Sequence, residues 1–193
     1  MKQRIAEILL NYSKKKITSK NLKSSAVLVP LFCSEGQYYV LFTERSNEVE
    51  FHKGEICFPG GTFQPGDTSL LQTALRESGE EIGLKAEEVE IQGELDDTIT
   101  VTSGYVISPF VAFIPHPYLF KVDYREIKQI LSVPLSAMMD EANFRRGEDM
   151  QTVEDEIIPV YYCEYKGHII WGATARILKH FTGLLLSESG ALC

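Results

Sequence analysis

GTFQPGDTSLLQTALRESGEEIGL, residues 61–84, is the stretch that predicts the fold, because a glycine-containing loop leads into an amphipathic helix with three glutamates. At about 100° per residue in an α-helix, Glu77, Glu80 and Glu81 fall within an arc of roughly 100°. The apolar positions of the same segment form the neighbouring stripe. One side of this helix therefore packs against the protein, while the adjoining side carries the acids.

The three glutamates repel one another. Glu77 with Glu81, and Glu77 with Glu80, are like-charge pairs at helical neighbour spacing, and each costs about 0.2–0.5 kcal/mol in an isolated helix. A cation relieves this cost, and Mg²⁺ prefers carboxylate oxygens while it keeps several of its waters. Arg76, four residues before Glu80, is placed to orient that carboxylate. The same pattern also fits a solvated helix face, because most charge runs are surface faces.

Both ends of the predicted helix carry the expected residue types. Asp67 or Thr68 can cap its start, and Gly83 fits a left-handed cap at its end. Just upstream, residues 54–58 predict a short strand that ends in Pro59 and two glycines. Glycine lets the backbone approach a ligand closely, so this loop is a candidate part of a site.

The order of residues in the helix adds a resemblance. Residues 76–84, RESGEEIGL, follow a Gly-Gly pair and resemble the Nudix box, whose pattern is G-x5-E-x7-R-E-U-x-E-E-x-G-U with U apolar. Asp67 stands at the first glutamate position, eight rather than seven residues separate it from Arg76, and Ser78 replaces the first apolar residue. The R-E-x-x-E-E centre is intact.

The resemblance implies the fold and the metal. It implies an α/β protein, a Nudix-type α/β/α sandwich in which a mixed sheet lies between the box helix and the terminal helices. It assigns Mg²⁺ or Mn²⁺ to Glu77 and Glu81 as metal ligands. Glu80 is a shared ligand or the candidate base, and it forms the catalytic set with Glu77 and Arg76. Spacing alone predicts only mixed α and β structure.

A second motif precedes the box. Residues 41–46, LFTERS, with His52 and the run FPGG at 58–61, look like the extra motif of coenzyme A pyrophosphatase-like Nudix enzymes, L-L-T-x-R-S-x3-R-x3-G-x3-F-P-G-G. Arg45 and His52 are therefore expected to bind substrate. A planar guanidinium suits phosphate oxygens, although a surface ion pair is the alternative for Arg45. Glu50 replaces the second arginine of the motif.

The glycines of this motif, Gly60 and Gly61, are expected to contact substrate, and one of their carbonyls is a candidate to complete the metal shell. In the branch that the motif resembles, coenzyme A or an acyl derivative is cleaved to adenosine 3′,5′-bisphosphate and 4′-phosphopantetheine. The sequence is therefore interpreted as a Mg²⁺-dependent hydrolase of a diphosphate-linked nucleoside. The metal would neutralise phosphate charge and lower the pKa of a bound water.

Two other functions stay open at this point. The first is a Nudix hydrolase that acts on ADP-ribose or a dinucleotide, because Glu50 reverses a charge of the coenzyme A motif. The second is a non-catalytic Nudix-fold binding module. Such a module is expected to lose box carboxylates, and all three are present here.

Composition bounds the class of protein. With 193 residues and 44% hydrophobic residues, the chain is expected to form a single domain over residues 1–193, with an N-terminal helix and lysine-rich linker in residues 1–24 and the box at 61–84. A net charge of −8 argues against nucleic-acid binding, because phosphate backbones require basic surfaces. The expected partner is a small-molecule nucleotide, and a homodimer is left open.

Cysteine usage and hydropathy indicate the compartment. The cysteines are scattered with no C-x-x-C pair, which is typical of reduced thiols rather than of a disulfide framework. No run approaches 18 apolar residues, so no membrane segment is expected. The N-terminal ten residues lack a secretory apolar region. A cytoplasmic location is therefore expected.

Other stretches leave alternatives open. Five lysines between residues 14 and 23 lie in a polar linker that is either solvated or meets a phosphorylated substrate. The acids of the run 94–97 form a solvated loop or supply another metal ligand. Residues 144–152 and 156–165 predict a hairpin around three acids at 154–156, which are solubility charges or the source of a base.

The two ends of the chain each predict a helix. Apolar residues at helical spacing extend the first helix to about Tyr12, and it is expected to cover a sheet edge. The last helix is expected to open at Ile169, with the run IIWGATA at 169–175. Its W-G-x-T-A segment is similar to one in coenzyme A-type Nudix proteins.

Overall fold

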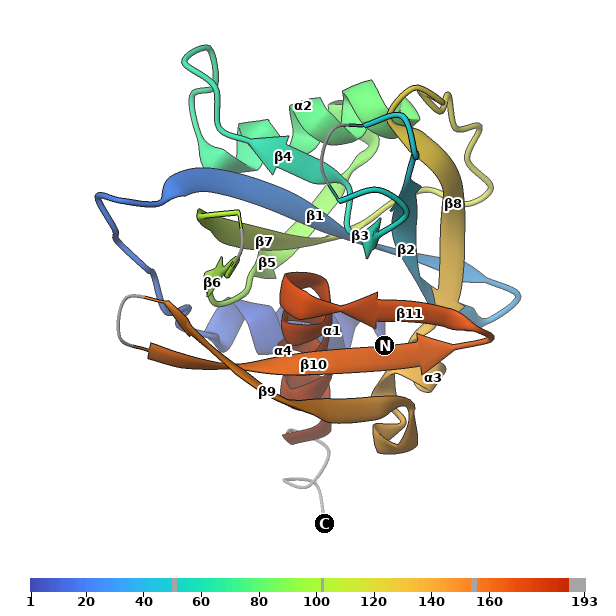
Figure 1. Ribbon diagram of the computed structural model, residues 1–193. Helices are drawn as coiled ribbons and strands as arrows, with labels where there is room; N and C mark the ends of the chain where they lie inside the picture. Colours follow the sequence, from blue (N-terminus) through green and yellow to red (C-terminus); the bar gives the residue numbers. More distant parts are fainter. Residues whose placement is uncertain (50–51, 102, 154–155, 188–193) are drawn as a thin grey trace.

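The computed structural model of the protein describes residues 1–49, 52–101, 103–153 and 156–187, and within 148–157 it describes the backbone alone. Groups of strands separate the α-helices along the chain (Figure 1). The helices are α1 (Lys2–Asn11), α2 (Leu70–Ile82), α3 (Leu135–Met139) and α4 (Gly172–Ser187), with short 3-10 turns η1 (Ala86–Glu88) and η2 (Glu141–Asn143). The strands are β1 (Lys23–Ser34), β2 (Gln37–Arg45), β3 (Ile56–Cys57), β4 (Gly60–Thr62), β5 (Glu90–Glu94), β6 (Thr98–Ile99), β7 (Tyr105–Phe113), β8 (Ile127–Pro134), β9 (Phe144–Val153), β10 (Glu156–Tyr165) and β11 (His168–Trp171).

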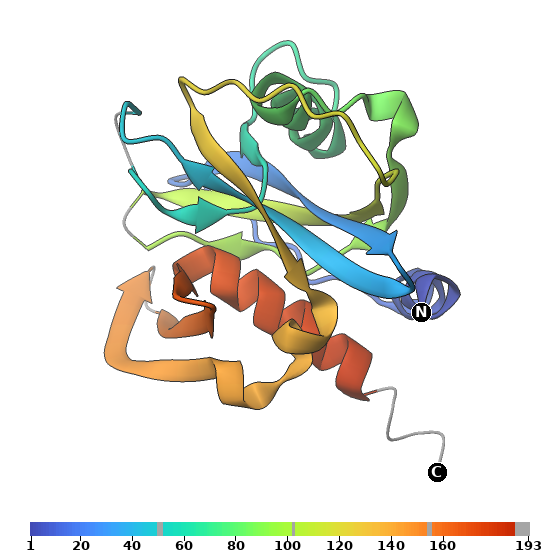
Figure 2. The ribbon, with the colours of Figure 1, turned by 90° about the vertical axis from the view of Figure 1, so that its right-hand side faces the viewer.

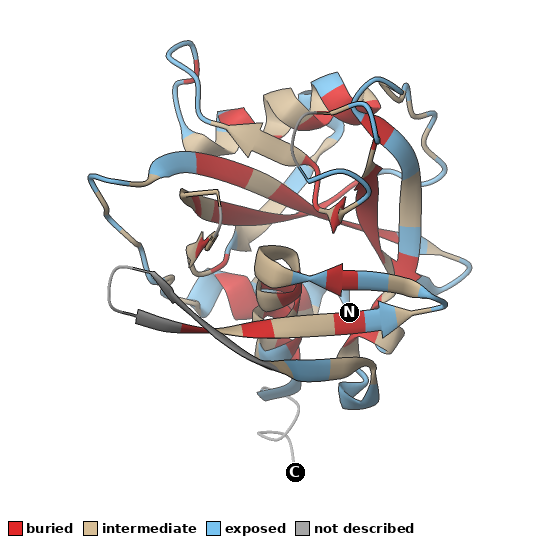
Figure 3. Cartoon of the chain, viewed as in Figure 1, coloured by how far each residue is buried: buried red, intermediate tan, exposed pale blue. Residues whose placement is uncertain are grey.

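Strand β1 is the centre of the larger sheet. It pairs in parallel with β7 and antiparallel with β2 and β4, which makes the sheet mixed. Strands β3, β2, β1, β7 and β5 follow one another across the sheet, and β8 and β6 add to β2 and β7. The uninterrupted apolar run of β1 is typical of a strand that is covered on both faces, and Figure 3 shows its middle buried.

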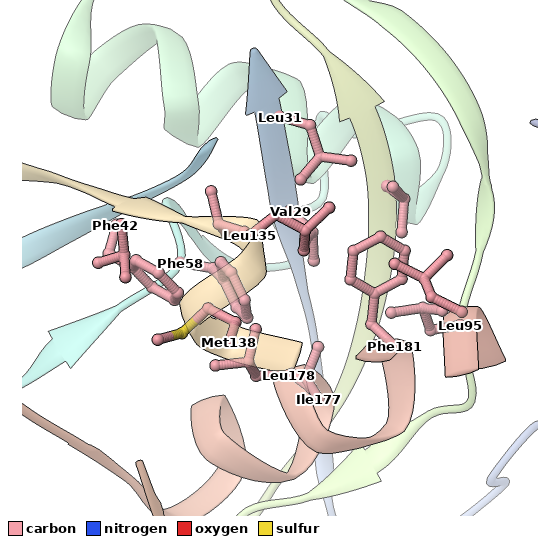
Figure 4. Packing of buried hydrophobic residues seen from close by; sticks show 14 of the residues in the cluster. Val29, Leu31, Phe42, Phe58, Leu95, Leu135, Met138, Ile177, Leu178 and Phe181 are labelled. Atoms are coloured by element: carbon pink, nitrogen blue, oxygen red, sulfur yellow. The ribbon is translucent and has the colours of Figure 1, made fainter. Parts of the chain in front are cut away.

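Helices cover both faces of this sheet. Because side chains alternate along a strand, Leu28 of β1 faces α2 while Val29 faces α4. On the α4 side, Phe181 and Leu178 pack with Val29 and with Phe58, as Figure 4 shows. Seen from the side, α2 and α4 lie on opposite sides of the sheet (Figure 2). The predicted α/β/α sandwich with a mixed sheet is therefore confirmed.

The last part of the chain forms a separate three-stranded sheet of β9, β10 and β11 against α4. The hairpin of β9 and β10 agrees with the sequence, whereas the predicted opening of the last helix at Ile169 is wrong. Residues 168–171 form a strand, since Ile170 is buried while Ile169 and Trp171 are exposed. Gly172, with φ of 65°, then turns the chain into α4.

Two predicted boundaries near the site also differ. The sequence of residues 44–50 predicts a loop, but strand β2 runs through Arg45, so the loop begins at Ser46. Neither Asp67 nor Thr68 caps α2, because the hydroxyl oxygen of Ser69 accepts the hydrogen bond from the Gln72 amide. Gly83 ends the helix in the left-handed conformation, as predicted.

The N-terminal segment covers the edge strand β5. Leu9 of α1 lies so close to Gly93 that a Cβ on Gly93 would be 2.7 Å from the Cβ of Leu9. The linker then crosses the acids after β5, where Asp96 accepts hydrogen bonds from the Tyr12 hydroxyl and the Lys15 amide. Asp96 and Asp97 thus accept hydrogen bonds from the linker, while Glu94 is 44% exposed and pairs with Lys14. These contacts fasten the linker to the sheet.

The lengths of the described helices bear on whether one of them could cross a membrane. The longest helix there, α4, has 16 residues. No helix among the described residues is both long and apolar enough to cross a bilayer.

Candidate active site

Helix α2 presents its acids to the glycines at the start of β4. The backbone N–H of Gly60 donates to Glu81 Oε2 over 3.3 Å, so the carboxylate lies at the edge of the glycine strand. Gly60 has φ of 150°, and a Cβ there would lie 2.3 Å from the carbonyl oxygen of Ala26. Only glycine brings this backbone between β1 and the helix.

Glu81 is the most enclosed of the three acids. Its side chain is 2% exposed, and the nearest cation is Arg45, whose Nη1 lies 4.0 Å from Oε1. Burial raises the pKa of Glu81 to about 8, against the lowering effect of Arg45. The carboxylate thus occupies a pocket that disfavours its charge and offers it few donors.

Glu77 lies beside Glu81 against the other glycine. A Cβ on Gly61 would be 2.4 Å from the carboxyl carbon of Glu77, so glycine leaves the room that this side chain fills. The Glu77 side chain is 15% exposed and pairs with Arg76 Nη1 at 2.9 Å. Burial raises the pKa of Glu77 as well. A buried and a half-buried carboxylate side by side, both with raised pKa values, are a donor set that fits a hard divalent cation.

Arg76 ties the loop before α2 to the helix. Its Nε and Nη2 donate to the two oxygens of Asp67 over 2.9 and 3.0 Å, and Nη2 also donates to the Thr62 carbonyl. These hydrogen bonds hold the pKa of the Asp67 carboxyl well below its usual range. Nη1 also reaches Glu80 Oε2 at 2.9 Å. Arg76 therefore holds the loop at Asp67 against α2, and it also holds the side chain of Glu80 at the surface.

The structure accordingly separates the three predicted acids into two groups. Glu77 and Glu81 come together at the glycines, whereas Glu80 is 59% exposed and is held by Arg76. Within the part of the chain that the structure describes, no three His, Cys, Asp or Glu side chains form a ready-made metal cluster.

Arg45, at the end of β2, points to this centre rather than forming an exposed ion pair. Its acidic neighbour is the enclosed Glu81, and its buried Nε has no hydrogen-bond partner in the structure. An unsatisfied buried donor costs about 1–3 kcal/mol, which an oxygen ligand would recover. The arrangement suits an anion that approaches Arg45 from outside.

His52 lies apart from the carboxylates of α2. It occupies the turn before β3 with φ of 59°, and its Nδ1 is 3.1 Å from Glu55 Oε2. Backbone bonds from Gly54 and Glu55 nevertheless attach this turn to β2 at Arg45. Glu50 lies outside the described residues, as do Glu154 and Asp155, and the Glu156 side chain is not described.

Glu126 is a site residue that the sequence did not reveal. Its charge is close enough to Glu77 and Glu81 to raise the pKa of both. The segment before it is fastened to the end of α2, because the Asp123 amide donates to the Glu81 carbonyl over 2.9 Å. In the sequence Glu126 is only a lone carboxylate next to Arg125, and such a signal is not specific.

Comparison with known proteins places this geometry in a family. The model described as "NUDIX domain" matches residues 22–130. A protein named uncharacterized Nudix hydrolase NudL from Photorhabdus laumondii is 32% identical over 166 residues, which is 83% of each chain. The mouse peroxisomal coenzyme A diphosphatase NUDT7 is 31% identical over 172 residues, 86% of this chain and 72% of the mouse protein.

A solved structure shows the same fold. A Caenorhabditis elegans Ap4A hydrolase in a binary complex superposes with a TM-score of 0.56 at 16% identity, over 86% of this chain and 99% of that one. The chain belongs to the Nudix hydrolase family and is a pyrophosphohydrolase. Members of this family bind nucleotide substrates and generally depend on a divalent metal ion.

Proposed function

We propose that the protein hydrolyses the diphosphate of coenzyme A or acyl-coenzyme A to adenosine 3′,5′-bisphosphate and 4′-phosphopantetheine. The observation that carries the proposal is the pair of the half-buried Glu77 and the buried Glu81 at Gly60 and Gly61, with Arg45 beside it. The similar mouse protein is named a coenzyme A diphosphatase, and the FPGG run matches the motif of that branch.

Glu77 and Glu81 would hold Mg²⁺ or Mn²⁺, with Glu80 and a carbonyl of Gly60 or Gly61 as further ligands. Their burial with raised pKa values supports this assignment, because a bound cation removes the cost of two enclosed negative charges. When bound, the metal neutralises phosphate charge and lowers the pKa of a coordinated water.

The remaining roles belong to side chains around this pair. Arg45 binds phosphate oxygens through its guanidinium, whose Nε has no hydrogen-bond partner in the structure. Arg76 positions Glu77 and the loop at Asp67. Glu126 accepts a proton from the attacking water, because it is exposed beside the pair while Glu80 is engaged by Arg76. His52 borders the substrate on the loop attached to Arg45.

Hydrolysis of coenzyme A in heavy-oxygen water tests the proposal. We expect both named products, and the position of the label identifies the phosphorus that is attacked. A panel with ADP-ribose and a dinucleotide is run beside it. If coenzyme A stays intact while one of these is cleaved, the coenzyme A assignment fails.

The panel also addresses the second candidate function, hydrolysis of ADP-ribose or a dinucleotide. The charge of Glu50 favours it, since the coenzyme A motif has arginine at that position. Replacement Glu50→Arg separates the two. If coenzyme A is the substrate, Glu50→Arg lowers the KM for coenzyme A. If another nucleotide is the substrate, Glu50→Arg does not lower the KM for that nucleotide.

A further inference from the structure

A row of flat side chains crosses the three-stranded sheet. Tyr162 of β10 pairs with Arg145 of β9 on one side and with Trp171 of β11 on the other. The guanidinium carbon of Arg145 lies 4.2 Å from the centre of the Tyr162 ring. The rings of Tyr162 and Trp171 are 16° from parallel, with centres 6.5 Å apart.

This row faces away from the core. The neighbours Cys163 and Ile170 are buried on the side of α4, so the alternation of a strand turns Tyr162 and Trp171 to the opposite face. Trp171 is 37% exposed. Tryptophan, tyrosine and arginine, the residue types in this row, are those that most often dominate binding at a surface.

The row lies on the side of the molecule that leads to the active site. Strand β11 contacts β3, and Figures 1 and 2 both show the small sheet below β3 on the same side. Cys57 of β3 is close enough to Glu81 for that charge to raise its pKa. Cys57 and Gly60 are three residues apart, so at most about 11 Å separates their Cα atoms. A nucleotide whose phosphates reach Gly60 can extend its base toward β11.

We propose that Trp171 and Tyr162 form the platform on which the purine base of the substrate stacks, with Arg145 beside it. The inference rests on the proposed function, because it takes the substrate to be an adenine nucleotide. Every base offers a flat π-face, and stacking on aromatic side chains is a strong and common way to hold one. Arg145 supplies a local cation for a phosphate on the nucleoside, in a chain whose net charge of −8 does not attract phosphates in general.

Trp171 is the one tryptophan of the sequence, so the fluorescence of the intact protein reports on this platform alone. The probe is adenosine 3′,5′-bisphosphate, which has no diphosphate bond to hydrolyse. We expect saturable quenching by this nucleotide and none by 4′-phosphopantetheine, which has no base. Replacement Tyr162→Ala weakens the binding by roughly 5- to 150-fold, the range for loss of one stacked base.

Two further variants keep the test sharp. Ile169→Ala removes a 48% exposed apolar side chain from the same strand and is expected to leave quenching unchanged. If Trp171→Ala does not fold, Trp171→Phe takes its place, because it keeps an aromatic ring at the position. The KM of Trp171→Phe for coenzyme A is then expected to stay below the KM of Tyr162→Ala. With either ring removed, KM rises while kcat stays within about twofold, since the reacting phosphorus is elsewhere.

The outcomes separate the platform from the proposed function. If coenzyme A is cleaved and the nucleotide does not quench Trp171, the platform is overturned while the function stands. If quenching saturates but coenzyme A is not cleaved, the platform stands and the function fails. Equal quenching by 4′-phosphopantetheine overturns base stacking. So does a dimer in sedimentation that Trp171→Ala dissociates, because a second copy of the chain would then cover this face.

Discussion

Two acidic pairs, Glu77 with Glu81 on α2 and Asp96 with Asp97 after β5, share a charge but differ in their surroundings. The aspartates are supplied with donors from the linker and the sheet. Asp97 accepts hydrogen bonds from the Ile17 amide and the Ser108 hydroxyl, and Lys14 lies 3.4 Å from it. Their negative charge is compensated within the protein.

Of the two glutamates of α2, Glu77 pairs with Arg76, whereas Glu81 lacks that compensation. Glu81 accepts one long hydrogen bond from Gly60, and its nearest cation is 4.0 Å away. Acids with a full set of donors hold a structure together, whereas buried acids with few donors are prepared for a ligand. Acid content alone does not distinguish the two pairs. Their hydrogen-bond partners do.

The strongest test of this contrast removes the charges of α2. In Glu77→Gln and in Glu81→Gln we expect kcat to fall by about 10³-fold or more, because a metal held by the acids contributes several kcal/mol to the transition state. The melting temperature stays the same or rises, since glutamine removes an enclosed charge. Steady-state kinetics with coenzyme A and thermal unfolding measure both. If either variant turns over coenzyme A at close to the wild-type rate, that glutamate is not a metal ligand.

Glu126→Gln sharpens the assignment of the base. We expect kcat to fall by about 10²-fold, the lower end of general-base effects, with little change in metal affinity. Glu80→Gln is the comparison: because Glu80 is proposed as a further ligand and is already engaged by Arg76, its loss should shift the magnesium dependence and lower kcat less. Magnesium titrations of kcat distinguish a base from a ligand. A larger loss in Glu80→Gln than in Glu126→Gln reverses the assignment.

Asp97→Ala tests the other pair. We expect a loss of about 2 kcal/mol in the free energy of unfolding, because the Ile17 amide and the Ser108 hydroxyl lose their acceptor. kcat of the folded protein changes little. Urea unfolding and kinetics on the same sample provide the comparison. A normal stability with impaired catalysis would mean that this pair also serves the site.

The smallest expected effect is a pH dependence at Tyr12. Burial, and then its hydrogen bond to Asp96, raise the pKa of Tyr12 to about 12. Because the folded pKa lies above the unfolded value of about 10, the stabilisation is complete below pH 10 and is lost as the pH rises toward 12. In Tyr12→Phe the free energy of unfolding should not show this additional fall between pH 10 and pH 12. Parallel urea curves for both proteins between pH 9 and 12 would contradict it.

Local patterns were sufficient for the box helix and for much of the sheet. The spacing of its apolar residues predicts α2, and Gly83 predicts its end, because both depend on residues within one or two turns. The hairpin of β9 and β10 also followed from its sequence. Strand β11 did not, because Ile169-Ile170-Trp171 is apolar at every position and alternates only once the fold buries Ile170 alone.

The parts of the site that depend on distant segments could not be predicted. Asp67 was a candidate cap, but Arg76 takes both of its oxygens, and that leaves capping to Ser69. Likewise, Glu126 meets Glu77 and Glu81 only because the segment before β8 returns to the end of α2. No periodicity encodes such a contact. The chemistry of the box was readable, while its neighbours required the three-dimensional structure.

The contact of Leu9 with Gly93 has a consequence for how the molecules behave toward one another. Helix α1 covers the face of β5, the strand at the end of the sheet, and an uncovered apolar face at a sheet edge recruits other chains. A single methyl group on Gly93 would collide with Leu9 and lift the helix away. The first symptom of that change would be self-association in solution, well before the distant catalytic chemistry was affected.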